Sequence, residues 1–149
     1  MRLTTVTPDN VRDACALEVE PGQERFVAPV AVSLAEAYAQ PDIGWPRLVL
    51  DGDDVVGFVM GAFDLTNPVD HFRCGIWRLA VAAGRQGRGH GRFAVEAFCA
   101  EALRRGQDRV TVLWVPGPGG PEGFYLRCGF TPTGQMFHGQ VVGERFLRT

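Results

Sequence analysis

Three glycines alternate with other residues at the start of the strongest helical pattern in the chain: Gly87, Gly89 and Gly91. They stand in residues 79–92, which join an apolar strand pattern directly to that helix. Glycine carries no Cβ, so backbone N–H groups can approach a ligand closely. A helix N-terminus adds free N–H donors and the positive end of the helix dipole. Three arginines of this segment add positive charge: Arg85, Arg88 and Arg92. The segment therefore predicts a binding site for a pyrophosphate or a similar anion.

Three kinds of phosphate loop could use such a segment. The P-loop needs a lysine after its last glycine, and this chain contains no lysine, so that loop is excluded. The dinucleotide fingerprint needs a third glycine where Arg92 stands, and its acid should follow a strand, whereas Asp108 precedes one. The third pattern, Q/R-x-x-G-x-G/A, is matched by Gln86, Gly89 and Gly91. The plain structural alternative is a flexible turn between a strand and a helix.

The third pattern resembles that of the GNAT superfamily of acetyl-CoA-dependent N-acetyltransferases. Residues 124–130, Phe-Tyr-Leu-Arg-Cys-Gly-Phe, resemble a second signature of the family, an apolar residue followed by Tyr-x-x-x-Gly-Phe. Four further segments resemble one bacterial branch, usually described as spermine/spermidine acetyltransferases: residues 23–28, 33–38, 56–60 and 76–79. The resemblance extends over nearly the whole chain.

The resemblance implies a binding mode for acetyl-CoA as co-substrate. The strand that ends in Leu79, Ala80 and Val81 would splay from its neighbour. These three residues would contact the pantetheine arm and the acetyl group. The loop residues would hold the pyrophosphate: Gln86, Gly87, Arg88, Gly89, His90, Gly91 and Arg92. A backbone N–H near Val81 would polarise the thioester carbonyl, as an oxyanion hole does.

The resemblance also implies direct attack of a neutral amine on the thioester, without an acyl-enzyme. The leaving thiolate has a pKa near 8.5, so its proton donor needs a higher pKa, and Tyr125 fits as general acid. The plain alternative for Tyr125 is a partly buried tyrosine in a helix. Cys128 has no identifiable histidine partner, which favours a buried thiol over a nucleophile.

The chain departs from the family pattern in two places. Pro118 stands where members often carry an asparagine that contacts coenzyme A. Residues 75–78 lack the glutamate base that some members carry there. A protonated amine still needs a base or a water relay, for which the sequence offers three candidates: His71, Glu24 and Asp64.

Composition narrows the class of protein. A length of 149 residues predicts a single domain over residues 1–149. A net charge of −2 argues against nucleic acid as a partner, and no apolar run is long enough to span a membrane. Four dispersed cysteines and three dispersed histidines show no metal-ligand spacing. With no signal-peptide pattern at the N-terminus, we expect reduced cysteines and a cytoplasmic location.

The sequence predicts four helices and six strands that must position the site. Helices are predicted from Thr7, over residues 26–38 with Pro29 kinking or dividing the pattern, over 88–105 and over 122–128. Strands are predicted over residues 47–50 and 55–60, joined as a hairpin, and over 71–81, 110–115, 130–137 and 140–147. On the long helix, Arg92/Glu96 and Glu101/Arg105 are spaced to pair. The order predicts an α/β, GNAT-like, mostly antiparallel mixed sheet of about six to seven strands with helices on both faces.

The leading interpretation is transfer of an acetyl group from acetyl-CoA to a primary amine of a small molecule, a polyamine being one candidate. Acidic residues on the two N-terminal helices or the turn between them would attract a polycation, the plain alternative being a solvated helix face: Glu18, Glu20, Glu24 and Glu36. The alternative acceptors are a protein N-terminus, an amino acid or an aminoglycoside. A coenzyme A-binding module without turnover remains an alternative from another class, and a homodimer is left open.

Overall fold

The computed structural model describes residues 1–148. Seven strands form one sheet in the order β1-β2-β3-β4-β5-β7-β6. The strands are β1 (Arg2–Thr4), β2 (Gly44–Asp51), β3 (Asp54–Phe63), β4 (Cys74–Val81), β5 (Arg109–Trp114), β6 (Thr131–Phe137) and β7 (Gln140–Phe146). The helices are α1 (Val11–Cys15), α2 (Val30–Ala39), α3 (His90–Arg104) and α4 (Glu122–Arg127), with a 3₁₀ turn, η1 (Asp70–Phe72). This arrangement confirms the expected mixed, mostly antiparallel sheet.

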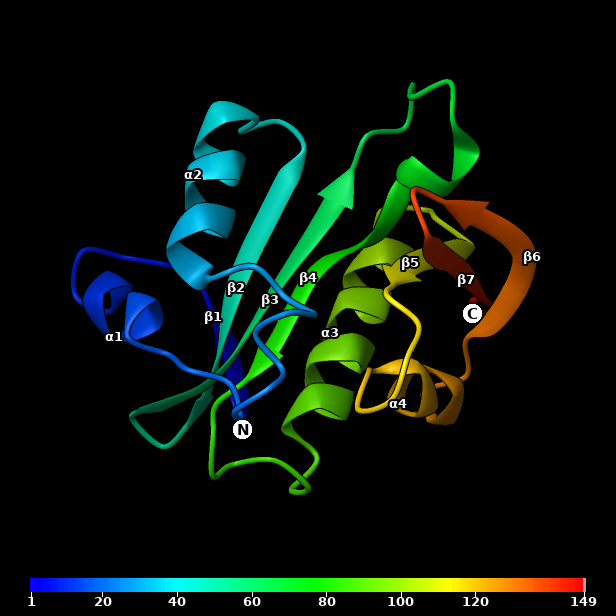
Figure 1. Ribbon diagram of the computed structural model, residues 1–149. Helices are drawn as coiled ribbons and strands as arrows, with labels where there is room; N and C mark the ends of the chain where they lie inside the picture. The colour runs from blue at the N-terminus through cyan, green and yellow to red at the C-terminus, as the bar shows by residue number, and fades with distance from the viewer. Residues whose placement is uncertain (149) are drawn as a thin grey trace.

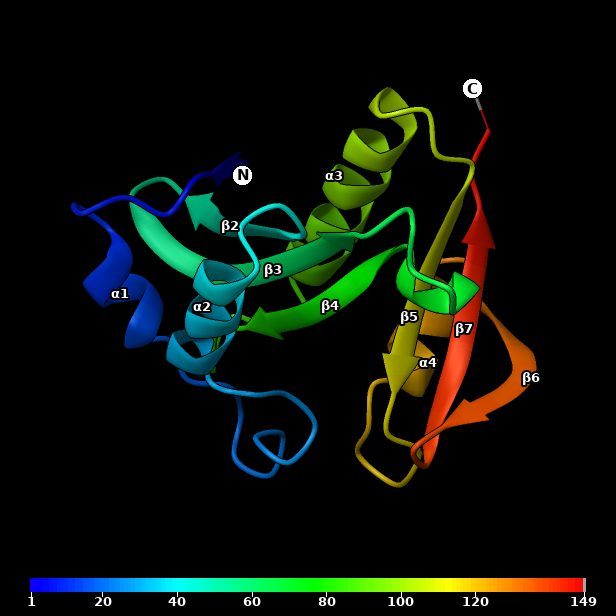
Figure 2. The same cartoon turned by 90° about the horizontal axis from the view of Figure 1, so that it is seen from above.

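Helices cover both faces of the sheet (Figures 1 and 2). Side chains alternate between the faces of a strand, so Leu48 and Phe58 join the core under α1 and α2. Val49 and Val59 join the larger core under α3 and α4. In that core, Phe98 of α3 is fully buried. The central strands are thus apolar on both sides, which anchors β4 between two packed layers.

Several element boundaries differ from the sequence expectations. Pro29 precedes the first residue of α2 and divides the pattern, so residues 26–28 are loop. The first helix begins at Val11, because residues 8–10 form a turn before it. His71 lies in η1, not in a strand, and β4 begins only at Cys74. The short strand β1 was not expected from the sequence; it pairs with β2 at the edge of the sheet.

The expected ion pairs on α3 are half confirmed. Glu101 pairs with Arg105, four residues on, at 2.8 Å. Glu96 does not pair with Arg92, because Arg145 on β7 reaches it instead at 2.8 Å. This second pair ties α3 to the far half of the sheet, which the spacing within a helix could not reveal.

The Glu96–Arg145 pair predicts a pH-dependent contribution to stability. The hydrogen bond from Arg145 holds the pKa of Glu96 below its ordinary value. The contribution is therefore present above the ordinary pKa and is lost as the pH falls through the lowered one. Because Glu96 is half exposed, we expect Glu96→Gln to lower the free energy of unfolding by about 0.5 kcal/mol at pH 7. Urea denaturation at pH 7 and pH 3 measures this, and an equal loss at both values would contradict it.

Candidate active site

The site begins where β4 separates from β5. These two strands form the one parallel pair of the sheet. Only Gly75 and Ile76 of β4 have partners on β5. On its other side β4 pairs with β3 as far as Val81. The N–H of Ala82 donates to Val56 O at 2.9 Å, and such bonds alternate along an antiparallel pair. The backbone groups of Leu79 and Val81 therefore point away from β3, toward the edge that β5 has left free.

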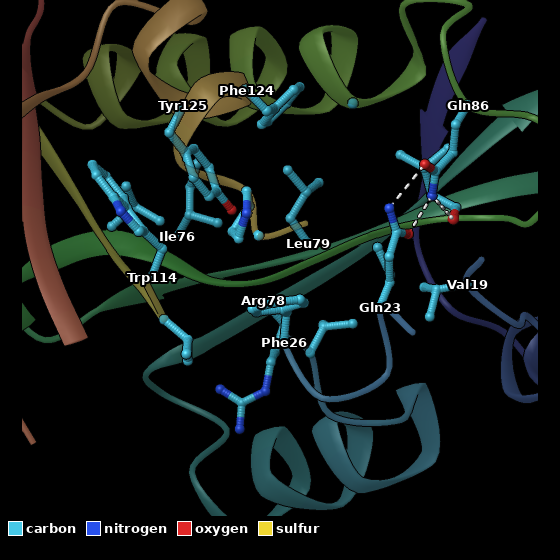
Figure 3. A pocket seen from close by; sticks show the side chains of 18 of the residues that line it. Val19, Gln23, Phe26, Ile76, Arg78, Leu79, Gln86, Trp114, Phe124 and Tyr125 are labelled. Carbon is cyan, nitrogen blue, oxygen red and sulfur yellow. Dashed lines mark hydrogen bonds between the residues drawn. The ribbon is translucent and has the colours of Figure 1, made fainter. Parts of the chain in front are cut away.

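A cavity of about 970 Å³ fills the space between the separated strands. Figure 3 shows Tyr125 and Trp114 on one side of it, with Arg78 and Phe26 across from them on the side nearest α2. Ten of the eleven site residues expected from the sequence line this cavity: Leu79, Ala80, Val81, Gln86, Gly87, Gly89, His90, Gly91, Arg92 and Tyr125. Arg88 is the exception, since it is exposed and does not line the cavity.

The glycine loop has the geometry of an anion cradle. Gly89 is the residue that caps the N-terminus of α3, and its φ of 84° lies in the left-handed region that favours glycine. A Cβ built on Gly89 would meet no atom within 4 Å, so the space in front of it is open. The first helical bond is donated by Phe93 to Gly89 O. The N–H groups of His90, Gly91 and Arg92 meet no acceptor among residues 1–148, which leaves three donors at the helix start.

The polar side chains of this loop are less free than the sequence suggested. Arg85 is paired with Asp54 at 2.8 Å, and Arg92 donates to Arg127 O at the end of α4, at 2.7 Å. The ring of His90 is buried, with Nδ1 2.8 Å from the sulfur of Met1. His90 therefore offers the cavity its backbone and not its ring. Two of the three arginines, Arg85 and Arg92, thus connect elements of the protein, which leaves them less available to an anion than the sequence suggested.

Residues 16–29, which we call the α1–α2 loop, cross the opening of the cavity. At one side, Gln23 and Gln86 exchange amide hydrogen bonds of 3.1 and 2.6 Å. Gln86 also donates to Val81 O at 3.3 Å. At the other side, Arg25 donates to Pro118 O at 2.8 Å. The loop thus connects the glycine loop to the loop before α4; the sequence contained no spacing signal for this contact.

Aromatic packing holds Tyr125 in place on the short helix α4. Its ring stacks on Trp114 with centroids 5.6 Å apart and planes 15° from parallel. Trp114 is itself fixed, because its indole N–H donates to Glu122 at 2.9 Å. Figure 3 shows the Tyr125 hydroxyl pointing into the cavity. The ring is thus positioned by its neighbours while its hydroxyl faces the site.

The Tyr-x-x-x-Gly-Phe spacing has a backbone explanation. Gly129 ends α4 with a φ of 92°. The N–H of Phe130 donates to Tyr125 O and that of Gly129 donates to Leu126 O, each at 3.1 Å. These two bonds make a Schellman motif, in which the residue after the glycine packs on the residue five before it. Phe130 accordingly meets Tyr125 edge-on, with centroids 5.7 Å apart.

The environment of Tyr125 keeps its hydroxyl protonated. Tyr125 is only 6% exposed, and this burial raises the pKa of Tyr125 above its ordinary value. A phenol of raised pKa stays neutral at physiological pH, so it keeps a proton that it can share with the sulfur as negative charge develops there. Burial also raises the pKa of the nearby Cys128 thiol, which is consistent with a buried thiol and not with a nucleophile.

The three candidate bases are not brought together. Glu24 lines the cavity, with its carboxylate accepting from Gly22 N–H at 2.9 Å. Asp64 follows β3 and accepts from the side chain of Asn67, away from the cavity. His71 is buried beside Phe72 and Phe137, also outside the cavity lining. Only Glu24 keeps its place as a candidate.

A known protein family matches this chain over the region that holds the site. A profile described as the acetyltransferase (GNAT) family matches residues 13–130. The chain belongs to this family. No curated protein sequence matches it significantly. The GNAT match covers both the glycine loop and the Tyr-x-x-x-Gly-Phe segment, and the protein is accordingly an acetyltransferase by family.

Solved GNAT structures share the fold at low sequence identity. The GNAT domain of PAT from S. lividans superposes with a TM-score of 0.77 at 16% identity, over 97% of this chain and 89% of that one. An aminoglycoside 6'-N-acetyltransferase complexed with coenzyme A gives 0.75 at 13%, over 100% and 98%. The ribosomal-protein-alanine N-acetyltransferase from Brucella melitensis gives 0.70 at 14%, over 99% and 100%. These matches establish the fold and leave the acceptor undetermined.

Among residues 1–148, no group of three or more His, Cys, Asp and Glu side chains is placed to hold a metal ion. In the same residues, the helices are too short or too polar to cross a membrane.

Proposed function

We propose that this protein transfers an acetyl group from acetyl-CoA to the primary amine of a small molecule. The observation that carries the proposal is the separation of β4 from β5, which places a free strand edge between the donors of the glycine loop and the Tyr125 hydroxyl. The cradle at Gly89 fits a pyrophosphate, because open space lies in front of three unpaired N–H donors. The structure of a neighbour with coenzyme A bound is consistent with this use of the fold.

The roles of the residues follow from their positions. The co-substrate supplies a thioester, whose pantetheine arm would pair with the free edge at Leu79 and Val81. The outward-facing N–H of Val81 would stabilise negative charge on the thioester oxygen. Tyr125 would protonate the departing thiolate, since its raised pKa keeps the proton available until the thiolate forms. These steps need no acyl-enzyme, in agreement with a protonated Cys128.

A direct experiment is thiol release from acetyl-CoA in the presence of a panel of amines, together with calorimetry of acetyl-CoA alone. We expect micromolar to millimolar binding and amine-dependent release, in the range usual for enzyme substrates. Binding without release for every amine would favour a coenzyme A-binding module and overturn the proposal.

Glu24 is our candidate for removing the proton from the incoming ammonium. Glu24→Gln should lower kcat/KM by about tenfold or more at pH 7, toward the lower end of general acid–base effects because a water relay can substitute in part. The defect should shrink as the pH approaches the pKa of the amine, since a neutral amine needs no base before attack. A pH profile of kcat/KM for both proteins measures this, and a defect of constant size across the profile would count against Glu24.

A polyamine acceptor receives little support from the charges of the site. Glu20 accepts from Gly84 N–H at 2.6 Å, and Glu36 is paired with Arg78. Glu18, Glu20 and Glu24 lie in the α1–α2 loop and not on a helix face. We propose further that the chain is one catalytic domain of the cytoplasm; its four unpaired cysteines, three of them buried, suit a reducing compartment.

A further inference from the structure

Two of the arginines that line the cavity lie away from the glycine loop. Five arginines and one glutamate line the cavity: Arg25, Arg78, Arg85, Arg92, Arg127 and Glu24. Three of the arginines belong to the glycine loop and to the helices α3 and α4 next to it, where phosphates are expected. Arg25 and Arg78 do not, because they come from the α1–α2 loop and from the middle of β4. These two lie on the opposite, acceptor side of the cavity.

Arg78 stands just past the point where β4 leaves β5. The register of β3 and β4 shifts between Met60 and Gly61, so Met60 faces Arg78 while Gly61 faces Ile76. This bulge leaves Trp77 unpaired and turns Arg78 toward α2, where its Nη2 lies 3.1 Å from Glu36. In Figure 3 its side chain lies on the side of the cavity nearest α2, across from Tyr125.

The guanidinium of Arg78 is incompletely satisfied. Nη2 donates to Glu36, and Nη1 donates to Trp77 O at 3.1 Å. Nε is buried and has no partner among residues 1–148. An unpaired buried donor destabilises the protein, and a small shift of the side chain toward an anion would satisfy it. A guanidinium presents paired donors that match the geometry of a carboxylate.

Arg25 adds a second cation on the same side. It takes part in none of the ion pairs formed within residues 1–148, and its guanidinium rests on the ring of Phe26, 4.4 Å from the centroid. One of its nitrogens is used by Pro118 O, which leaves further donors free. Its neighbour Glu24 is the one acidic side chain of the cavity lining. The acceptor side thus offers the charges of Glu24 and Arg25 and the guanidinium of Arg78, which Glu36 pairs through one of its nitrogens.

We infer that the acceptor is an amine that also carries a carboxylate, as an α-amino acid does, and that Arg78 and Arg25 bind this carboxylate. The inference rests on the proposed acetyl transfer and names its acceptor class. Glu24 faces the ammonium end of such a zwitterion, while the arginines face its other end. A polyamine, in contrast, would bring several positive charges to two arginines.

The test compares amines that differ only in the carboxylate. Phenylalanine, phenethylamine and phenylalaninamide are offered with acetyl-CoA, and likewise leucine and 3-methylbutylamine, with rates normalised to the fraction of neutral amine. We expect kcat/KM for each amino acid to exceed that for its partner without carboxylate by about tenfold or more, as for a charge-assisted hydrogen bond. Calorimetry should show the same preference for binding.

Two variants test whether Arg78 and Arg25 cause the preference for a carboxylate. Arg78→Gln should lower the ratio of the two kcat/KM values by about tenfold, and Arg25→Gln should lower it severalfold. Because Arg25 is exposed, its variant remains informative if Arg78→Gln proves unstable. Arg12→Gln, an exposed arginine of α1, is the matched control and should leave the ratio unchanged.

The outcomes separate this inference from the proposed function. Equal rates with and without the carboxylate, or an unchanged ratio in both variants, would overturn the inference while acetyl transfer to amines stands. Faster reaction of phosphoethanolamine than of the amino acids would also overturn it, in favour of a phosphate. Absence of thiol release with every amine would overturn the proposed function and this inference with it.

Discussion

Replacing Tyr125 by phenylalanine should lower kcat by about 100-fold or more, the usual effect of removing a general acid. The change removes only the hydroxyl, because the ring that stacks on Trp114 and meets Phe130 remains. The Kd of acetyl-CoA and the melting temperature should therefore change little. The loss should appear in kcat and not in binding, since the proton is needed only as charge develops on sulfur.

The measurement is kcat, acetyl-CoA affinity and melting temperature on one preparation. Tyr38→Phe is the matched control, because Tyr38 is the other tyrosine of the chain and is 87% exposed on α2. Since burial raises the pKa of Tyr125, the wild-type kcat should show no loss from its deprotonation up to about pH 10, the ordinary tyrosine value. A variant that keeps more than about half of the turnover would assign the proton to water instead.

Replacing Gly89 by valine should abolish measurable binding of acetyl-CoA. A valine side chain would occupy the open space in front of the N-terminus of α3, where we place the pyrophosphate. It would also strain the backbone, because φ is 84° at this residue and a β-branched residue rarely adopts such a value. Both effects act on the cradle, while no core side chain is lost.

The backbone strain needs its own control. Gly106 has a φ of 83°, also with no atom within 4 Å of a built Cβ, but it follows the other end of α3. Gly106→Val should therefore carry the same strain and leave the affinity for acetyl-CoA intact. Calorimetry of both variants, with circular dichroism as a check of folding, separates the two effects. Normal affinity in a folded Gly89→Val protein would remove the phosphate site from this loop.

Local patterns in the sequence were sufficient for most of the elements. The helix over α3 and the hairpin of β2 and β3 follow from apolar periodicity and from the turn around Gly52, which are local properties. The errors fall where periodicity is short or where proline and tertiary contacts compete with it. The sequence predicts a strand over residues 71–81 from apolar and aromatic residues near its end, yet η1 forms over residues 70–72 and presents His71 O to the buried hydroxyl of Thr111.

The residues proposed for the site could be named from the sequence for a related reason. Glycines that alternate at a helix start are required by the backbone itself, since Gly89 needs a positive φ and its neighbours need free N–H groups. The spacing of Tyr125, Gly129 and Phe130 likewise encodes a Schellman motif within one short segment. Both features depend on residues close in sequence, so both can be read from it.

The acceptor side depended on contacts that no local pattern contains. Sequence spacing could not show that Glu36 lies beside Arg78, 42 residues away, or that Arg25 reaches Pro118, 93 residues away. It also could not decide among Glu24, Asp64 and His71, because the split of β4 from β5 and the path of the α1–α2 loop determine which of them reaches the cavity. The sequence by itself determined the glycine loop and the turn from Tyr125 to Phe130, because short segments set the backbone geometry there. The charges that face the acceptor were decided only by the tertiary structure, because packing brings them together from separate elements.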